Sequence, residues 1–522
     1  MKKYLLIFFV TIVGLGAGSC SDWLDLRPES EIVLEDFWQD ESDVTQVLAG
    51  CYRAMTEDGY MERMLIWGEV RSDNVIGRSV GGVPTAMYRL INGEVTVDND
   101  FVHWGSMYSV INYCNTLLLY GPGVVERDEH FTQAQFNSIK AEVLTLRAIS
   151  YFYLVRTFRA VPWIETASVD DNQDYQVAAS SEEEVLNRLL EDLAFAERYS
   201  RDRFETKQLT KGRITRSAVR ALMADIFLWM EDYENAVKYC DLVLSNEELE
   251  LLPGKDLSEE AFYLGNSVES IFELQFNRDV QVNNRVNEYL GWYQEQNGFW
   301  AFPLNLVSGG GASKPNIFNR NEGSAVESAK DYRLKDFLYP FSIENYSVFK
   351  YSGAFRTESA DGNTSTYTFG SRTPNWIVYR LADILLLKAE ALVEMDQLSE
   401  ALDLVNQVYL RMNYDDETGL VLSNYPTKES MRELVLRERQ RELMFEGKRW
   451  FDLVRYGRRL NDAGAVSSKV SVKFSGSSGS PSQNWQVLDA LYFPIHIDEI
   501  NINRKLKQNP YYDIESETTN KK

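Results

Sequence analysis

Two stretches of the chain repeat one spacing of apolar residues, and this repeat limits the possible fold more than any other feature. The first stretch is RSAVRALMADIFLWMEDYENAVKYCDLVL and the second is YRLADILLLKAEALVEMDQLSEALDLVNQVYL. In both, a small residue is followed by three further apolar positions in steps of three, nine and four. The matching positions are Ala224, Phe227, Ala236 and Cys240, then Ala389, Leu392, Ala401 and Val405.

This alternation of small and large residues is typical of a tetratricopeptide helix pair, in which alanines let two antiparallel helices approach closely. Tyr233 and Gln397 lie at the expected turns, and RAISYFYLVRTF, with Ala148 and Tyr151, is a candidate start for a third unit. Two unrelated amphipathic hairpins are the alternative, but agreement at four positions favours the repeat. The repeats are not in tandem, so a uniform solenoid is excluded and long insertions must separate the helix pairs.

Two further parts of the chain differ in their sequence pattern, one helical and one irregular. Helical spacing recurs in DESDVTQVLAGCYRAM, WGSMYSVINYCNTLLLY and FNSIKAEVLTLRAISYFYLVRTF, which predicts a mostly α chain to about residue 250. From about 250 to 375 the chain is rich in Gly, Ser, Asn and aromatic residues, with ESIFELQF and TSTYTF as candidate strands. The predicted fold class is therefore mostly α: a platform of tetratricopeptide-like helix pairs with long irregular loops and a few short strands.

The first twenty residues, MKKYLLIFFVTIVGLGAGSC, combine a basic start, a short apolar run and small residues before a cysteine. This pattern predicts a secretory signal peptide over residues 1–19, because the apolar run is too short to span a bilayer. AGSC is similar to a bacterial lipobox, so we expect Cys20 to become an acylated N-terminus that carries palmitate-type chains. Cleavage of an ordinary signal after Ala17 or Ser19 is the alternative. Two or more acyl chains anchor a protein stably in a membrane.

Composition and motifs exclude several classes of function. A net charge of -24 argues against a nucleic-acid partner, because phosphate binding requires clustered Lys and Arg. The widely spaced Cys51, Cys114 and Cys240 are predicted to be buried apolar residues rather than a disulfide framework. No nucleophile elbow or phosphate-binding loop occurs. The histidines, at positions 103, 130 and 496, are scattered along the sequence, so we expect no bound metal and no cofactor.

The stretch RERQRELMFEGKRWFDLVRYGR, from Arg437 to Arg458 and hereafter the signature stretch, concentrates acidic side chains among arginines. Glycosidase carboxylates face each other across a cleft at about 5 to 9 Å, whereas here the glutamates recur every four residues. This spacing predicts one acidic stripe on a helix that ends at Gly447, neutralised by neighbouring arginines. We therefore predict a structural ion-pair motif rather than a catalytic pair, made by Glu438, Arg439, Glu442, Glu446, Arg449, Asp452 and Arg455.

The spacing of the signature stretch resembles the C-terminal motif of the SusD/RagB family of outer-membrane nutrient-uptake lipoproteins. The lipobox, WLDLRPES, both helix-pair units, and LYFPIHIDEININ with LKQNPYY follow in the order of that family. Local departures occur at Arg159 and Ala160, where Gly and Asp are common, and at His496 and Tyr511, where Pro and Gly are common.

The resemblance implies a non-catalytic, surface-exposed lipoprotein of the outer membrane. Such a protein would bind a glycan and deliver it to a SusC-like TonB-dependent transporter. Capture of a peptide, as in RagB, is the first alternative; an all-α glycoside hydrolase and a protein-only tetratricopeptide adaptor are less favoured. The implied organisation is a signal peptide (1–19), an N-terminal helical region (20–250) and an interlocked C-terminal region with variable loops (251–522).

Candidate ligand-binding residues follow from the chemistry of sugars. A sugar needs flat aromatic surfaces for its apolar face, and amide, carboxylate or Arg groups for its hydroxyls. The alternative for each candidate is a core aromatic or a polar turn residue, because Trp is usually buried. The candidates are Asp73, Asn74, Arg78, Trp104, Trp292, Tyr293 and Trp300.

Overall fold

The computed structural model describes residues 37–75, 85–169, 175–277, 331–340, 346–358, 365–369, 373–413, 419–471 and 485–513, together with 284 and 286. Several predicted features lie outside these residues: the signal peptide, Cys20, Arg78, Trp292, Tyr293 and Trp300.

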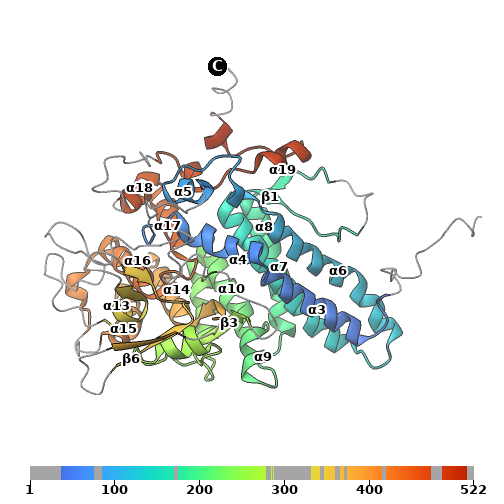
Figure 1. Cartoon of the computed structure of the whole chain (residues 1–522), viewed down its shortest axis with the longest axis horizontal. Helices are drawn as coiled ribbons and strands as arrows, with labels where there is room; N and C mark the ends of the chain where they lie inside the picture. The colour runs from blue at the N-terminus through green and yellow to red at the C-terminus, as the bar shows by residue number, and fades with distance from the viewer. Residues whose placement is uncertain are drawn as a thin grey trace, which may run out of the picture.

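Four long helices build the N-terminal part of the fold. They are α3 (Glu41–Met55), α6 (Gly105–Arg127), α7 (Gln133–Phe158) and α8 (Glu182–Tyr199). Helix α6 packs between α3 and α7, and α7 also packs against α8 (Figure 1). Capping boxes at Asp40 and Thr132 define the starts of α3 and α7, because each cap satisfies backbone N–H groups that the first helical turn leaves free.

The two predicted helix pairs are present and stack on each other. The first is α10 (Arg216–Trp229) with α11 (Tyr233–Leu244), and the second is α14 (Leu381–Glu394) with α15 (Leu398–Met412). Helix α11 contacts α14, and α10 contacts α8, so the pairs continue the layer that α7 and α8 begin. The small residues at the crossings are buried, as the spacing predicted; Phe227 is half-buried and stacks on Tyr239.

Shorter elements connect and flank this helical layer. The helices are α4 (Asp58–Leu65), η2 (Ile66–Val70), α5 (Thr85–Ile91), η3 (Asp100–Val102), α9 (Lys207–Gly212), η4 (Ser258–Leu264), α13 (Tyr332–Asp336), η7 (Leu422–Asn424), α16 (Lys428–Leu443), α17 (Arg449–Leu460), α18 (Ala463–Ser471), η9 (Leu488–Leu491) and α19 (Ile497–Ile502).

Among the described residues, strands occur in four antiparallel pairs. The pairs are β1 (Val161–Pro162) with β2 (Ala179–Ser180), β3 (Ser270–Leu274) with β8 (Trp376–Arg380), β4 (Leu338–Pro340) with β5 (Tyr346–Val348), and β6 (Ala354–Glu358) with β7 (Ser365–Phe369). Both candidate strands, ESIFELQF and TSTYTF, contain a strand of the structure, β3 and β7 respectively.

One large apolar core runs through the molecule, and a smaller core lies between α14, α15 and α16. Cys51, Cys114 and Cys240 are buried and unpaired, as expected. Contacts cross the predicted boundary at residue 250, since α11 packs on α14 and Arg71 donates to the carbonyl oxygen of Leu491 over 2.8 Å. Within the described ranges, no helix is both long enough and apolar enough to span a bilayer.

Candidate functional site

The signature stretch forms two helices joined by a tight turn rather than one continuous stripe. Helix α16 ends at Leu443, and α17 begins at Arg449. Phe445 and Gly447 both have a positive φ, so the chain reverses direction between the helices. The prediction that Glu446 continues the stripe on the helix was therefore wrong, because Glu446 lies in the turn.

Glu442 is neutralised by cations from other parts of the chain, not by the arginines next to it in sequence. Its carboxylate is 3.0 Å from the guanidinium of Arg333 on α13 and 2.7 Å from that of Arg380 at the end of β8. Arg411 of α15 makes a third ion pair with it. Burial would raise the pKa of Glu442, but the charges of Arg411, Arg380 and Arg333 hold that pKa well below its ordinary value.

The other acidic groups of the signature stretch also have buried partners. Glu438 pairs with Arg333 over 2.7 Å and with Arg441 over 3.0 Å. Glu446 accepts hydrogen bonds from Arg380 and from the Nζ of Lys350, which lies 2.6 Å from its Oε1. These pairs connect α13 to α16, and they connect β8 and the segment after β5 to the turn between α16 and α17.

A second group of ion pairs ties the signature stretch to α14. Asp452 binds Arg439 over 2.9 Å and Arg455 over 2.7 Å, and Arg439 also binds Asp383 of α14 over 2.9 Å. Arg455 forms a further 2.7 Å pair with Glu390 of the same helix. Burial opposes ionisation of Asp383, yet the charges of Lys448 and Arg439 lower its pKa to about 2. All of these charged side chains are buried, and the structural role of the group remains a prediction.

Three of the candidate ligand-binding residues lie in the core, which corrects their assignment to an exposed face. The carboxylate of Asp73 receives two hydrogen bonds from Arg449, over 2.7 and 2.8 Å. Asn74 is fully buried and accepts from the amide of Gln440 over 2.9 Å. Trp104 is 4% exposed and packs edge-on against Phe158. Each residue is accounted for by packing or by a buried partner.

Glu69 adjoins this region and differs from the other acids because no cation of the described residues forms an ion pair with it. Its Oε1 accepts from Asn74 over 2.7 Å and from the backbone N–H of Phe445 over 3.0 Å. Its Oε2 makes no hydrogen bond with any described residue. Burial raises the pKa of Glu69 to about 7.

This raised pKa predicts that Glu69→Gln gains stability relative to the wild type as the pH rises. In the wild type, the neutral carboxyl of Glu69 contributes to the free energy of unfolding. This contribution is fully present below the unfolded pKa of 4.5. It is lost as the pH rises through about 7, because the carboxyl then ionises in the buried interior. Urea unfolding at pH 5 and pH 8 should show a relative gain of more than about 1 kcal/mol for the variant. The exposed Glu429→Gln is the control, and an equal change in both variants would contradict the assignment.

An open cleft of about 480 Å³ lies between α6 and two other stretches of the chain, residues 164–168 and 175–177. Its lining mixes aromatic and aliphatic side chains with amides and hydroxyls. The lining residues are Tyr108, Ile111, Asn112, Asn115, Ile164, Thr166, Ser168, Tyr175 and Val177.

Hydrogen bonds hold the walls of this cleft in place. The side-chain amide of Asn112 pairs with both backbone groups of Ser168, over 2.6 and 3.2 Å. Asn115 donates to the carbonyl oxygen of Ile164 over 2.9 Å, and Tyr108 donates to that of Pro162 over 2.7 Å. The segment after β1 is therefore fastened along α6, and the cleft is preformed.

Several groups remain accessible on these walls. Tyr175 is 53% exposed. The hydroxyls of Thr166 and Ser168 are exposed and make no hydrogen bond within the described part of the chain. None of the residues that line the cleft was among the ligand-binding candidates predicted from the sequence. The one available signal was Asn112 and Asn115, two amides on a largely apolar helix, and their partners at residues 164–168 come from a separate segment.

Comparison with known proteins shows where this architecture belongs. Residues 339–512 match the model of the SusD family, and residues 22–228 match a model described as starch-binding and associating with the outer membrane. The chain belongs to the SusD family. Its mostly helical fold agrees with that of solved SusD-superfamily structures.

Relatives and solved structures extend this similarity over nearly the whole chain. SusD-like protein P38 of Formosa agariphila is 26% identical over 98% of this chain and 100% of its own length. A SusD-like protein of Bacteroides ovatus is 24% identical over 88% of this chain and 84% of its own.

Many solved structures share the fold, and two of them serve as examples. A SusD superfamily protein of Bacteroides vulgatus has a TM-score of 0.70 and 20% identity, covering 91% of this chain and 99% of its own. NanU of B. fragilis has a TM-score of 0.67 and 20% identity, covering 93% of this chain and 100% of its own.

Proposed function

We propose that this SusD family protein is a non-catalytic, lipid-anchored protein of the outer membrane that binds a glycan and delivers it to a SusC-like TonB-dependent transporter. The observation that carries the proposal is the family match. The model that matches residues 22–228 is described as starch-binding and associating with the outer membrane. The lipobox at Cys20 supports a lipid anchor that exposes the protein at the cell surface. The signal peptide and the two regions divided near residue 250 remain part of the proposal.

The cleft beside α6 supports glycan binding on chemical grounds. Tyr175 offers an exposed ring for the apolar face of a sugar, and the hydroxyls of Thr166 and Ser168 can exchange hydrogen bonds with sugar hydroxyls. The described lining residues include no carboxylate, whereas glycoside hydrolysis uses a pair of carboxylates. The carboxylates of the signature stretch are buried in ion pairs, which also favours a structural over a catalytic role.

The ligand class can be identified by thermal unfolding in the presence of neutral glycans, acidic glycans and peptides. A ligand that binds only the folded protein raises Tm by mass action. We expect a glycan to raise Tm without being cleaved. Cleavage would favour a hydrolase, stabilisation by peptides alone would favour peptide capture, and no response to either class would favour a protein-only adaptor.

For the cleft, we expect Tyr175→Ala to weaken binding of the stabilising glycan about tenfold, equivalent to about 1.4 kcal/mol. Tyr113→Ala is the matched control, since Tyr113 is 50% exposed on α6 but does not line the cleft. Calorimetric titration measures both affinities. Unchanged affinity in Tyr175→Ala would show that the glycan binds elsewhere. Substitutions of Arg78, Trp292, Tyr293 and Trp300 would then be tested.

A further inference from the structure

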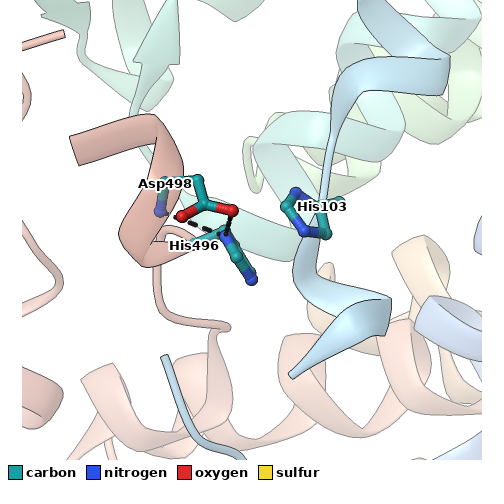
Figure 2. Close-up of side chains that lie close together, drawn as sticks. All are labelled: His103, His496 and Asp498. Atoms are coloured by element: carbon teal, nitrogen blue, oxygen red, sulfur yellow. Dashed lines mark hydrogen bonds and ion pairs between the residues drawn. The ribbon is translucent and has the colours of Figure 1, made fainter. Parts of the chain in front are cut away.

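Two of the three histidines in the chain lie against each other, although they come from opposite ends of the sequence. The ring centroids of His103 and His496 are 3.5 Å apart, with an angle of 29° between the ring planes. Asp498 completes a cluster with them, as Figure 2 shows. Their separation in the sequence had argued against a metal site, but folding brings them together.

The backbone on both sides of the cluster is held in place. His103 lies between η3 and α6, and its carbonyl oxygen accepts from the Nε of Arg63 over 3.1 Å. His496 is the N-cap of α19, and the next residue, Ile497, donates its N–H to the carbonyl oxygen of Val97 over 2.9 Å. The two imidazoles are therefore positioned by separate, well-anchored segments.

The cluster offers several donor atoms. The Nδ1 of His496 accepts from the backbone N–H of Asp498 over 3.1 Å and lies 3.5 Å from its Oδ2. Ligand atoms from all three residues lie within 4.8 Å of one another. Neither ring nitrogen of His103, nor the Nε2 of His496, forms a hydrogen bond with a described residue. His496 is only 6% exposed.

We propose that His103, His496 and Asp498 bind a divalent transition-metal ion of the Zn²⁺ class, with water completing the coordination. Imidazole nitrogen and carboxylate oxygen are ligands that Zn²⁺ prefers, at about 2.0–2.2 Å. Tetrahedral ligands at that distance are about 3.4 Å from each other. The ligand atoms of the three residues lie within 4.8 Å of one another, so a movement of the side chains brings them to that spacing. The ring of His103 must turn out of the stack, because stacked rings direct their lone pairs side by side.

The local electrostatics favour a cation. Burial, followed by the charge of His103, lowers the pKa of His496. The negative charges of Asp498, Asp98 and Asp100 act on the same ring. Arg63 is the nearby cation, but it donates to backbone carbonyl groups and pairs with Glu62 over 3.1 Å.

Metal binding here would join two distant parts of the chain. His103 precedes α6 of the N-terminal region, whereas His496 and Asp498 begin α19 near the C-terminus. A bound ion would therefore clamp α19 to the N-terminal region, and this effect is separate from the binding of glycan in the cleft.

The first test compares metal binding in the wild type and in His103→Ala, His496→Ala and His130→Ala, after removal of metal with EDTA. His130 is the remaining histidine and is exposed, so it is the matched control. We expect saturating Zn²⁺ to raise Tm by about 3 °C in the wild type and in His130→Ala. Affinity, measured by calorimetry, should fall at least about tenfold in the other two variants. Equal affinity in all four proteins would overturn the proposal.

A second test needs no substitution. Selective isotope labelling of histidine gives three imidazole signals, one for each histidine of the chain. Adding Zn²⁺ at pH 7.5 should move the signals of His103 and His496 and leave that of His130 unchanged. The response should weaken at pH 5.5, because the ligands must be deprotonated. A shift confined to His130, or no shift, would overturn the proposal, whether or not the protein binds glycan.

Discussion

Replacing Glu442 with alanine is expected to lower the free energy of unfolding by about 3–5 kcal/mol, because it removes one partner of a fully buried group of ions. Glu442 is completely inaccessible and contacts the guanidiniums of Arg333, Arg380 and Arg411. Four other carboxylates, of Asp331, Glu269, Glu438 and Glu446, pair with these arginines, but Lys350 and Arg441 share Glu446 and Glu438. Without Glu442, five cations face four carboxylates, so the variant leaves an excess positive charge in the interior.

Glu433→Ala is the matched control for this prediction. Glu433 lies on the same helix, α16, and pairs with Lys469 over 2.7 Å, but its side chain is 39% exposed. Exposed ion pairs contribute about 0–1 kcal/mol, so the control should change little. Urea unfolding followed by circular dichroism measures both variants. If Glu442→Ala kept its stability but lost glycan affinity, the signature stretch would belong to the binding site instead of the scaffold.

Gly68→Ala is expected to destabilise the protein by about 3 kcal/mol or more, because an added methyl group has no space. Gly68 lies in the π-helix η2, where its backbone approaches the turn between α16 and α17. A Cβ atom at this position would be 1.8 Å from the carbonyl oxygen of Gly447. The backbone of Gly447 has little room to move away, since it is itself closely packed. A Cβ on Gly447 would be 2.7 Å from the carbonyl oxygen of Met64.

Gly50→Ala is the control for the effect of a methyl group alone. Gly50 lies within α3, and a Cβ there would meet no heavy atom within 4 Å. Alanine favours a helix over glycine by about 1 kcal/mol, so this variant should be neutral or more stable. Thermal unfolding of the two variants distinguishes the outcomes. Equal stability of Gly68→Ala and the wild type would mean that η2 and the turn can move apart without lowering the free energy of unfolding.

The helix pairs show what local pattern can predict. The spacing of Ala224, Ala236, Ala389 and Ala401 depends on the 3.6-residue turn and on close packing of neighbouring helices, so a short window of sequence contains it. The same information does not say that α11 packs on α14, because long insertions separate the two pairs. Local spacing thus predicted each pair, and tertiary packing set their order in the layer.

The ligand-site candidates show where local pattern misleads. Asp73 and Asn74 follow Ser72 in a segment that is polar enough for an exposed loop. Burial of such groups requires partners, and Arg449 and Gln440 supply them from the far end of the chain. Trp104 is buried among α6, α7 and their neighbours, since Tyr108 and Phe158 surround it.

The signature stretch combines both kinds of information. Its residue types and spacing were enough to predict a structural motif and the SusD family, since these properties depend on residues close together in the sequence. Contacts between distant segments determine three other features. These are the partners of Glu442, the cleft beside α6, and the pairing of His103 with His496. Only the tertiary structure decides these, because a side chain's burial, charge partners and accessibility are properties of the packed chain rather than of its neighbours in sequence.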